Sequence, residues 1–351
     1  MHFCTKFLIV ITAFCSYSME LKQPIVSYIL NKINNSEEGT NSRADPLSKN
    51  VEGLEKLLSE TEALNQTEKI YTVEHLVKSN GYPIETHYVT TGDGYILRVH
   101  RIPSSPKMNA SNGKVAFLQH GILCSAADWV ITGSEKGLGF LLADAGYDVW
   151  MGNARGNTWS RNHTTLNPDK DAKFWKFSFH EIGLYDIPAM IDYALEKTGA
   201  SSVYYVGHSQ GTTAYYVMLS ELPAYNSKIK MAANLAPIAF LNHMSPLFQI
   251  MSLFEPMGNF LANLIGINEF MPTSNFFKYL IGNKICAEDS VTEYLCTNAL
   301  FAFCGFDYAQ LNKTLLLFII KYTPAGGSTR QFFHYGQAIH SDKTNILSDL
   351  D

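Results

Sequence analysis

The sequence lacks an excess of positive charge, with 27 Lys and Arg against 32 Asp and Glu and a net charge of −5. Proteins that bind nucleic acid carry a basic patch, so this balance argues against a nucleic-acid partner. The spaced Cys and His patterns of metal sites are also missing, so neither a metal nor another cofactor is expected. Beyond the N-terminus no apolar run is long enough to span a bilayer, and the most apolar one, residues 315–320, ends at Lys321.

The N-terminal residues resemble an export signal. Lys6 precedes a short apolar stretch over residues 7–14, and the small residues Ser16 and Ser18 follow. So short a stretch is typical of a signal peptide, which we place at residues 1–18; the alternative is an uncleaved anchor. The chain is therefore expected to enter the secretory pathway and to be secreted or lysosomal. Glycosylation sequons fit this route and occur at Asn34, Asn65, Asn109, Asn162 and Asn312.

Cysteine is scarce, with six residues in the chain. Cys4 and Cys15 would leave with the signal peptide, and an oxidising compartment would allow the remaining four to form a disulfide. Cys286 and Cys296 are close in sequence, so we favour a bridge between them. The alternative is four unbridged thiols.

Composition and periodicity divide the rest of the chain into three parts. Residues 19–68 are rich in Asn, Glu, Ser and Lys, which predicts a polar, disordered pro-segment or linker. Residues 69–239 alternate strands with helices, which predicts a three-layer α/β sandwich with a mostly parallel sheet. Short apolar strands are expected at "KVAFLQHG", "YDVWMGN", "VYYVGHS" and "MAANLAP", with helices over residues 139–145, 182–197 and 210–222; "HYVTTGDGYILRVHRIP" predicts a hairpin around Asp93 and Gly94.

The third part, residues 240–351, loses the strand–helix alternation. It is dense in Phe, Leu, Met and Ile and is interrupted by Pro246, Pro256 and Pro272. We interpret it as an inserted helical cap or lid; the alternative is the core of a second helical domain. Only the cap hypothesis predicts an apolar pocket that faces Ser209.

The motif that indicates chemistry is G-x-S-x-G, formed by Gly207, Ser209 and Gly211. A buried strand precedes Ser209 and a helix follows it, as a nucleophile elbow requires, and the flanking glycines leave room for the tight turn. Ser209 is therefore predicted to be a nucleophile, with the N–H of Gln210 ready to bind an oxyanion. The alternative is a glycine-rich structural turn.

A second oxyanion donor is expected from the loop that follows an earlier strand. In "FLQHGILCSAADW" the chain turns at His120 and Gly121, so the N–H of Ile122 can point to the site. His120 itself is interpreted as a structural hydrogen-bonding residue. Two charged residues outside the motif receive structural interpretations as well: Arg155 orders a loop, and Asp186 caps a helix.

Several blocks of the sequence resemble the acid lipase family of gastric and lysosomal lipases and steryl ester hydrolases. They are "HGILCSAADW", "ADAGYDVWMGNARGNTWSRNH", "FWKFSFHEIGLYDIPAMIDY", "YVGHSQGTT", "LAPIAF", "CTNALFAFCGFD" and "TPAGGSTRQFFHYGQ". The resemblance extends from about residue 72 to residue 343. It implies an α/β-hydrolase fold with an inserted cap, Ser209 as nucleophile, an oxyanion hole formed by the N–H groups of Ile122 and Gln210, and a cap disulfide between Cys286 and Cys296.

The resemblance ends before the triad is complete. An α/β hydrolase supplies its acid and histidine after the nucleophile, on loops that follow the last two strands, and "TNILSDLD" stands where that part should begin. We therefore expect the last two strands and the triad Asp and His to be missing from this chain. Rescue by His243, His334 or His340 is not expected, because a base must lie within hydrogen-bond reach of the serine. An exposed apolar edge at "MAANLA" is expected as well.

The combined hypothesis is a serine ester hydrolase that acts on neutral lipid esters, triacylglycerol or steryl ester, at a droplet or micelle surface. In this form it is expected to be inactive or weakly active. An incomplete or alternatively spliced product of an active lipase is favoured over a catalytically dead lipid-binding or carrier protein. A third hypothesis is an esterase or peptidase on the same fold.

Overall fold

The computed structural model describes residues 71–108, 111–241, 244, 249, 252, 268–270, 318–319 and 321–340. The chain separates into two compact units, Met1–Lys69 and Ile70–Asp351, and the described residues all belong to the second. Several predictions therefore lie outside the described residues: the signal peptide, the polar segment 19–68, most of the cap, and the side chains of Asn34, Asn65, Asn109, Asn312, Cys286 and Cys296.

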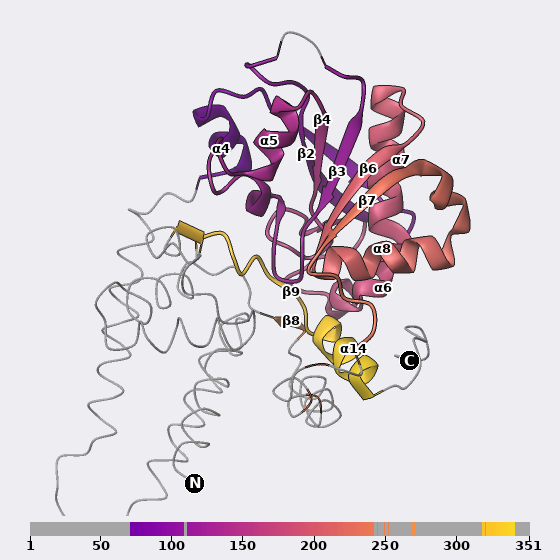
Figure 1. Ribbon diagram of the computed structural model, residues 1–351. Helices are drawn as coiled ribbons and strands as arrows, with labels where there is room; N and C mark the ends of the chain where they lie inside the picture. The colour runs from indigo at the N-terminus through magenta and orange to yellow at the C-terminus, as the bar shows by residue number, and fades with distance from the viewer. Residues whose placement is uncertain are drawn as a thin grey trace, which may run out of the picture. The chain divides into compact units, whose positions relative to one another are not determined.

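A seven-stranded sheet forms the centre of this unit (Figure 1), with the order β1-β2-β4-β3-β6-β7 and β5 beside β2. Four strands are parallel to one another, and β1 and β2 run antiparallel at one edge. The strand bounds are β1 Glu85–Thr90, β2 Tyr95–Ile102, β3 Val115–Gln119, β4 Asp148–Gly152, β5 Asn162–His163, β6 Val203–His208 and β7 Ile229–Leu235. The strands predicted from the sequence are confirmed, each within two residues at its ends.

The predicted hairpin between β1 and β2 is also confirmed. The N–H of Thr91 donates to the carbonyl of Tyr95 at 2.8 Å, and the Thr91 hydroxyl donates to Asp93 at 2.6 Å. Gly94 has a φ of +99°, a conformation that is open to glycine and strained for other residues. The residues of the turn itself therefore determine its conformation.

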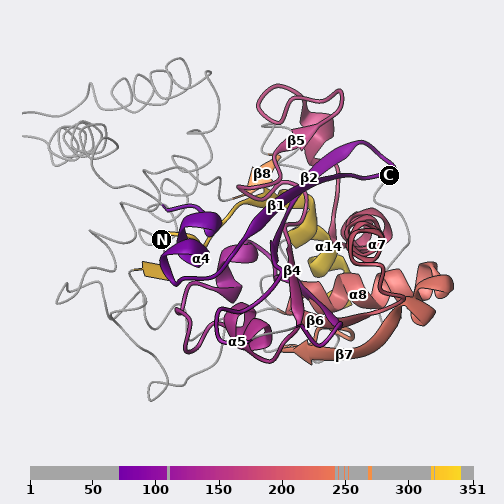
Figure 2. The same ribbon diagram turned by 90° about the horizontal axis from the view of Figure 1, so that it is seen from above.

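Helices cover both faces of the sheet (Figure 2). On one face lie α4 and α5, and on the other lie α6, α7 and α8. Their bounds are α4 Val73–Ser79, α5 Leu138–Asp144, α6 Phe179–Glu181, α7 Ile187–Thr198 and α8 Gln210–Glu221, with a π-helical turn at Ile182–Asp186 and 3-10 turns at Ala126–Trp129, Ala172–Trp175 and Pro223–Lys228. The three-layer α/β architecture is thus confirmed.

Strand β3 shows why the sheet needs cover on both faces. Val115 and Phe117 belong to the hydrophobic core under α7 and α8, whereas Ala116 and Leu118 belong to the core under α4 and α5. Successive side chains of a strand point to opposite faces, so a continuous apolar run fills two cores. Burying a side chain such as Phe117 stabilises the fold by roughly 1.5–3 kcal/mol.

Strand β7 closes the sheet order at one edge and pairs only with β6 among the described residues. Met231 and Leu235 on this strand are 62% and 43% exposed. The predicted apolar edge at "MAANLA" is therefore confirmed for the part of the chain that the structure describes. Such an edge offers unpaired main-chain groups to other chains.

The segment 321–340 packs against the sheet and the loops that leave it. Tyr322 is buried in the core under α4 and α5, and Ala325 contacts the loop after β3. The short strand β9, Gly327–Ser328, pairs with β8, Glu269–Phe270, and leads into helix α14, Thr329–His340. Figure 1 shows α14 in yellow beside α6 and α8. The division of the chain at residue 240 into core and cap stays a prediction.

Candidate active site

Ser209 stands on a sharp turn between β6 and α8. Its φ of 50° and ψ of −117° are strained for a residue with a side chain. The turn is possible because its neighbours are glycines: a Cβ on Gly211 would lie 2.4 Å from the carbonyl oxygen of Gln119, and one on Gly207 would lie 3.1 Å from the Gly211 main chain. The local geometry matches the predicted nucleophile elbow.

The start of α8 leaves main-chain donors available beside Ser209. No side chain caps this helix. The Ser209 N–H donates to the Leu235 carbonyl at 2.9 Å, and the Thr212 N–H donates to the Ser209 carbonyl at 2.9 Å. The N–H of Gln210, in contrast, finds no acceptor among the described residues. The N-terminus of a helix also carries a partial positive charge, so this end suits an anion.

The loop after β3 lies against the same serine. Gln119 and Gly207 are register partners on the parallel strands β3 and β6, so both loops leave the sheet at the same edge. A Cβ on Gly121 would lie 3.0 Å from the Cβ of Ser209, which places the loop backbone directly at the elbow. Within the described part of the chain the N–H of Ile122 has no acceptor, and the next residue, Leu123, has a φ of 58°. The structure thus brings Ser209, Ile122 and Gln210 together.

His120 is buried behind this loop. Its Nε2 accepts the Ala154 N–H at 3.0 Å, which leaves Nδ1 protonated to donate to the Gly121 carbonyl at 2.8 Å. Burial lowers the pKa of the imidazole from 6.5 to about 4, so it is neutral at ordinary pH. The predicted structural role of His120 is confirmed.

Arg155 and Asp186 form a buried pair. The interpretation of Arg155 as a loop-ordering residue is confirmed, since its guanidinium bridges Asp186 and Asp93 with contacts of 2.7 and 2.6 Å. The interpretation of Asp186 as a helix cap is wrong. The side chain caps no N–H, because a π-helical turn continues α6 into α7 and the carboxylate faces Arg155 instead.

No described histidine reaches the Ser209 hydroxyl. The Nδ1 of His334 lies 2.9 Å from Ser178 Oγ, and its ring stacks on Phe179. The side chains of His243 and His340 lie outside the described residues. His334, the one histidine after Ser209 whose side chain the structure describes, is therefore held by Ser178 and Phe179.

Two buried residues that the sequence did not single out lie behind the loop that follows β3. Asn153 and Asn157 are 0% and 3% exposed, and each bonds main-chain groups of that loop. The available signal was a pair of asparagines spaced by four directly after a buried strand, in "GNARGNTW".

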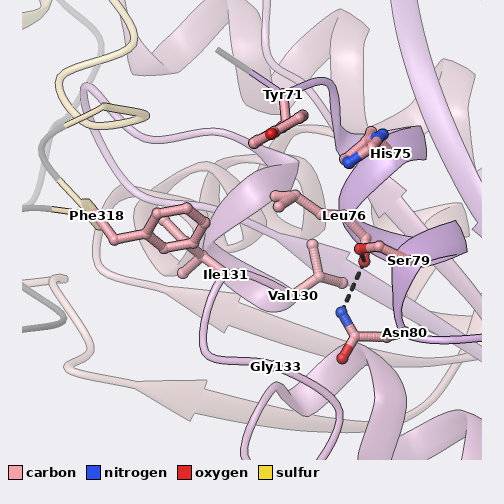
Figure 3. Close-up of a pocket in the computed structure, with 9 residues that line it drawn as sticks. All are labelled: Tyr71, His75, Leu76, Ser79, Asn80, Val130, Ile131, Gly133 and Phe318. Carbon is pink, nitrogen blue, oxygen red and sulfur yellow. Dashed lines mark hydrogen bonds between the residues drawn. The ribbon is translucent and has the colours of Figure 1, made fainter. Parts of the chain in front are cut away.

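A hollow of about 360 Å³ lies elsewhere on the unit (Figure 3). Tyr71 and His75 stack at its rim with ring centroids 4.1 Å apart, and Asn80 donates to the Leu76 carbonyl at 2.8 Å. Val130, Ile131 and Phe318 make its wall apolar. Ser209 does not line this hollow, so the predicted apolar pocket over the serine stays a prediction.

Two further expectations concern a glycosylation sequon and membrane-spanning helices. Asn162, the one sequon asparagine within the described ranges, is exposed on β5. None of the helices that the structure describes has the length and apolar character needed to cross a membrane.

Two family models match the chain. "Partial alpha/beta-hydrolase lipase region" matches residues 73–133, and "alpha/beta hydrolase fold" matches residues 114–260. A solved α/β hydrolase from Novosphingobium aromaticivorans is 16% identical, with a TM-score of 0.40, and covers 68% of this chain and 63% of its own. That structure is too dissimilar to support any assignment beyond the one that the family models give.

Curated relatives are much more similar. Lipase 3 of Drosophila melanogaster is 50% identical over 76% of this chain and 68% of its own length. Mouse gastric triacylglycerol lipase is 43% identical over 77% of this chain and 68% of its own. Human lysosomal acid lipase/cholesteryl ester hydrolase is 42% identical over 77% and 67%. With identity this high over most of both chains, and with a serine elbow in a hydrolase sheet, this chain belongs to the acid lipase family of ester hydrolases.

Proposed function

We propose that the protein hydrolyses lipid esters with Ser209 as the nucleophile. The Ser209 Oγ adds to the ester carbonyl, the alcohol leaves with a proton, and water then releases the fatty acid from the acyl-serine. The N–H groups of Ile122 and Gln210 hold the oxyanion that forms in each half of the reaction. The observation that carries this proposal is the strained Ser209, which lies next to the Gln210 N–H and against the loop of Ile122; neither N–H finds an acceptor among the described residues.

The substrate is proposed to be a neutral lipid ester, a triacylglycerol or a steryl ester, met at a droplet or micelle surface. The names of the relatives support this choice, since one is a triacylglycerol lipase and another a cholesteryl ester hydrolase. The same relatives support a route through the secretory pathway, and the exposed Asn162 is available there for glycosylation.

Turnover by this chain is proposed to be weak. A serine hydroxyl is a poor nucleophile without a base, and two of the described histidines, His120 and His334, are bonded to other groups. The same observation favours a second candidate, a lipid-binding protein in which the elbow persists without chemistry. The two candidates differ in whether Ser209 ever carries an acyl group.

The test is pre-steady-state hydrolysis of p-nitrophenyl acetate and p-nitrophenyl palmitate by the wild-type chain, Ser209→Ala and the exposed control Ser201→Ala. We expect a burst of p-nitrophenol, up to one per chain, from the wild type and Ser201→Ala, larger with the palmitate ester, followed by slow turnover. Equal release by Ser209→Ala would overturn the proposal. Palmitate binding without any burst would establish the lipid-binding candidate.

A further inference from the structure

We propose that Asn153 and Asn157, together with His120, are positioning residues that fix the loop 120–126 so that the Ile122 N–H faces the oxyanion. This inference rests on the proposed function of Ser209. It assigns a role to the two asparagines of the "GNARGNTW" motif, whose hydrogen bonds go to groups other than Ser209.

Asn157 joins the loop to the turn in which it lies. Its Nδ2 is 3.4 Å from the Cys124 carbonyl, 3.1 Å from Asn153 Oδ1 and 3.2 Å from His120 Nε2. Its Oδ1 accepts the main-chain N–H groups of Trp159 and Ser160 at 3.0 and 3.1 Å. The carboxamide therefore uses one end for its own turn and the other for the oxyanion loop.

Asn153 holds the far end of the loop. Its Oδ1 accepts the Ala126 N–H at 3.0 Å, and its Nδ2 donates to the Arg98 carbonyl on β2 at 2.9 Å. Since β2 is an inner strand, this bond ties the loop to the interior of the sheet.

The three side chains contact the loop on both sides of Ile122 in the sequence. His120 bonds the Gly121 carbonyl before it, Asn157 lies against the Cys124 carbonyl after it, and Asn153 bonds the Ala126 N–H beyond. A strained residue such as Leu123, with its φ of 58°, persists only where its surroundings fix it. An oxyanion donor stabilises charge best when it is already oriented before the reaction. These hydrogen bonds therefore contribute to catalysis as well as to folding.

A second set of hydrogen bonds reaches the loop through Ala325. The Ala325 N–H donates to the Leu123 carbonyl at 2.6 Å, and the Ala325 carbonyl accepts both the N–H and the hydroxyl of Thr158 at 2.8 and 3.0 Å. Thr158 directly follows Asn157. The motif therefore bonds the loop directly through Asn153 and Asn157, and indirectly through Thr158 and Ala325.

The key variant is Asn157→Asp, which keeps the oxygen that accepts from Trp159 and Ser160 and removes the N–H donors that face the loop. Asn157→Ala is the companion, because it removes the donors without burying a charge. The matched control is Asn80→Asp, which likewise removes a donor to a main-chain carbonyl, that of Leu76, at a site without contact to the loop.

Two readouts separate positioning from general stability. Hydrogen exchange followed by mass spectrometry should show the Cys124 and Ala126 amides exchanging at least about tenfold faster in both Asn157 variants than in Asn80→Asp, with β3 and α8 unchanged. The acylation rate constant of Ser209 should fall about 10- to 100-fold at unchanged KM for p-nitrophenyl acetate, as expected when an oxyanion donor is misplaced.

Loop exchange in the Asn157 variants equal to that of the control would overturn the inference, and so would a loss confined to KM. If the wild-type chain shows no acylation of Ser209, the proposed function fails. The exchange experiment still decides whether the asparagines hold the loop, so the two failures are distinguishable.

Discussion

Arg155 and Asp186 form an ion pair sealed from solvent, with side chains 1% and 0% exposed and Nη2 and Oδ1 2.7 Å apart. The Arg155 main-chain N–H also donates to the second carboxylate oxygen at 2.9 Å. The pair fastens the loop after β4 to the start of α7. It therefore supports the segment that carries Asn153 and Asn157.

Removing Asp186 should be destabilising, because the buried Arg155 would keep only the partly exposed Asp93 as its counter-charge. Asp186→Asn is expected to lower the free energy of unfolding by about 3–5 kcal/mol, measured by urea denaturation. The control is Asp169→Asn, which breaks the pair with Arg161 at a carboxylate that is 72% exposed and should cost under about 1 kcal/mol. Equal losses in the two variants would contradict the importance of burial.

The glycine after Gln210 should tolerate no side chain. In Gly211→Ala the new methyl group would meet the Gln119 and His120 carbonyls at 2.4 and 2.9 Å, and backbone atoms cannot turn away as side chains can. We expect a loss of at least about 1–3 kcal/mol in unfolding free energy, together with loss of the ester burst. Gly92→Ala meets nothing within 4 Å and should change neither quantity.

Much of the fold was predictable because its signals are local. The hairpin at Asp93 and Gly94, the buried β3 run and the glycines around Ser209 each depend on neighbouring residues. The task of Asp186 was not predictable in this way, because its partner Arg155 lies 31 positions earlier and meets it only in the folded chain.

The loop after β3 illustrates the same limit. A strand followed by His120 and Gly121 predicts where the loop lies. Its support by Asn153, Asn157 and the distant Ala325 depends on tertiary packing, which no local pattern encodes. The cap over Ser209 stays a prediction from apolar composition.

Stability should fall as the pH drops below about 6.5, in part because of His120. In the folded protein burial lowers the pKa of this imidazole to about 4, whereas the unfolded chain takes up the proton near the ordinary value of 6.5. Between these values the unfolded state binds more protons, so the His120 contribution is complete above pH 6.5 and is lost toward pH 4. The loss amounts to at most about 3 kcal/mol.

The comparison variant for this effect is His120→Gln, which keeps an acceptor for Ala154 and does not titrate. The difference in unfolding free energy between wild type and variant should shrink by about 2–3 kcal/mol from pH 7 to pH 4, measured by urea denaturation across this range. A difference that stays constant with pH would show that His120 is not buried in its neutral form.

The exposed edge at β7 should promote association. Met231→Lys places a charge on this edge at a side chain that is 62% exposed, so we expect less aggregation in light scattering at an unchanged melting temperature. Met108→Lys makes the same change on an exposed loop residue and should leave aggregation as it is. Equal effects of both substitutions would point to net charge rather than to the strand edge.

The most direct test of the central claim is reaction with a long-chain alkyl fluorophosphonate, followed by mass spectrometry of the peptides. A phosphonate ester bonded to the Ser209 oxygen, absent in Ser209→Ala and present in Ser201→Ala, is the predicted result. A folded wild-type chain that carries no adduct at Ser209, or an adduct that survives in Ser209→Ala, would contradict the account.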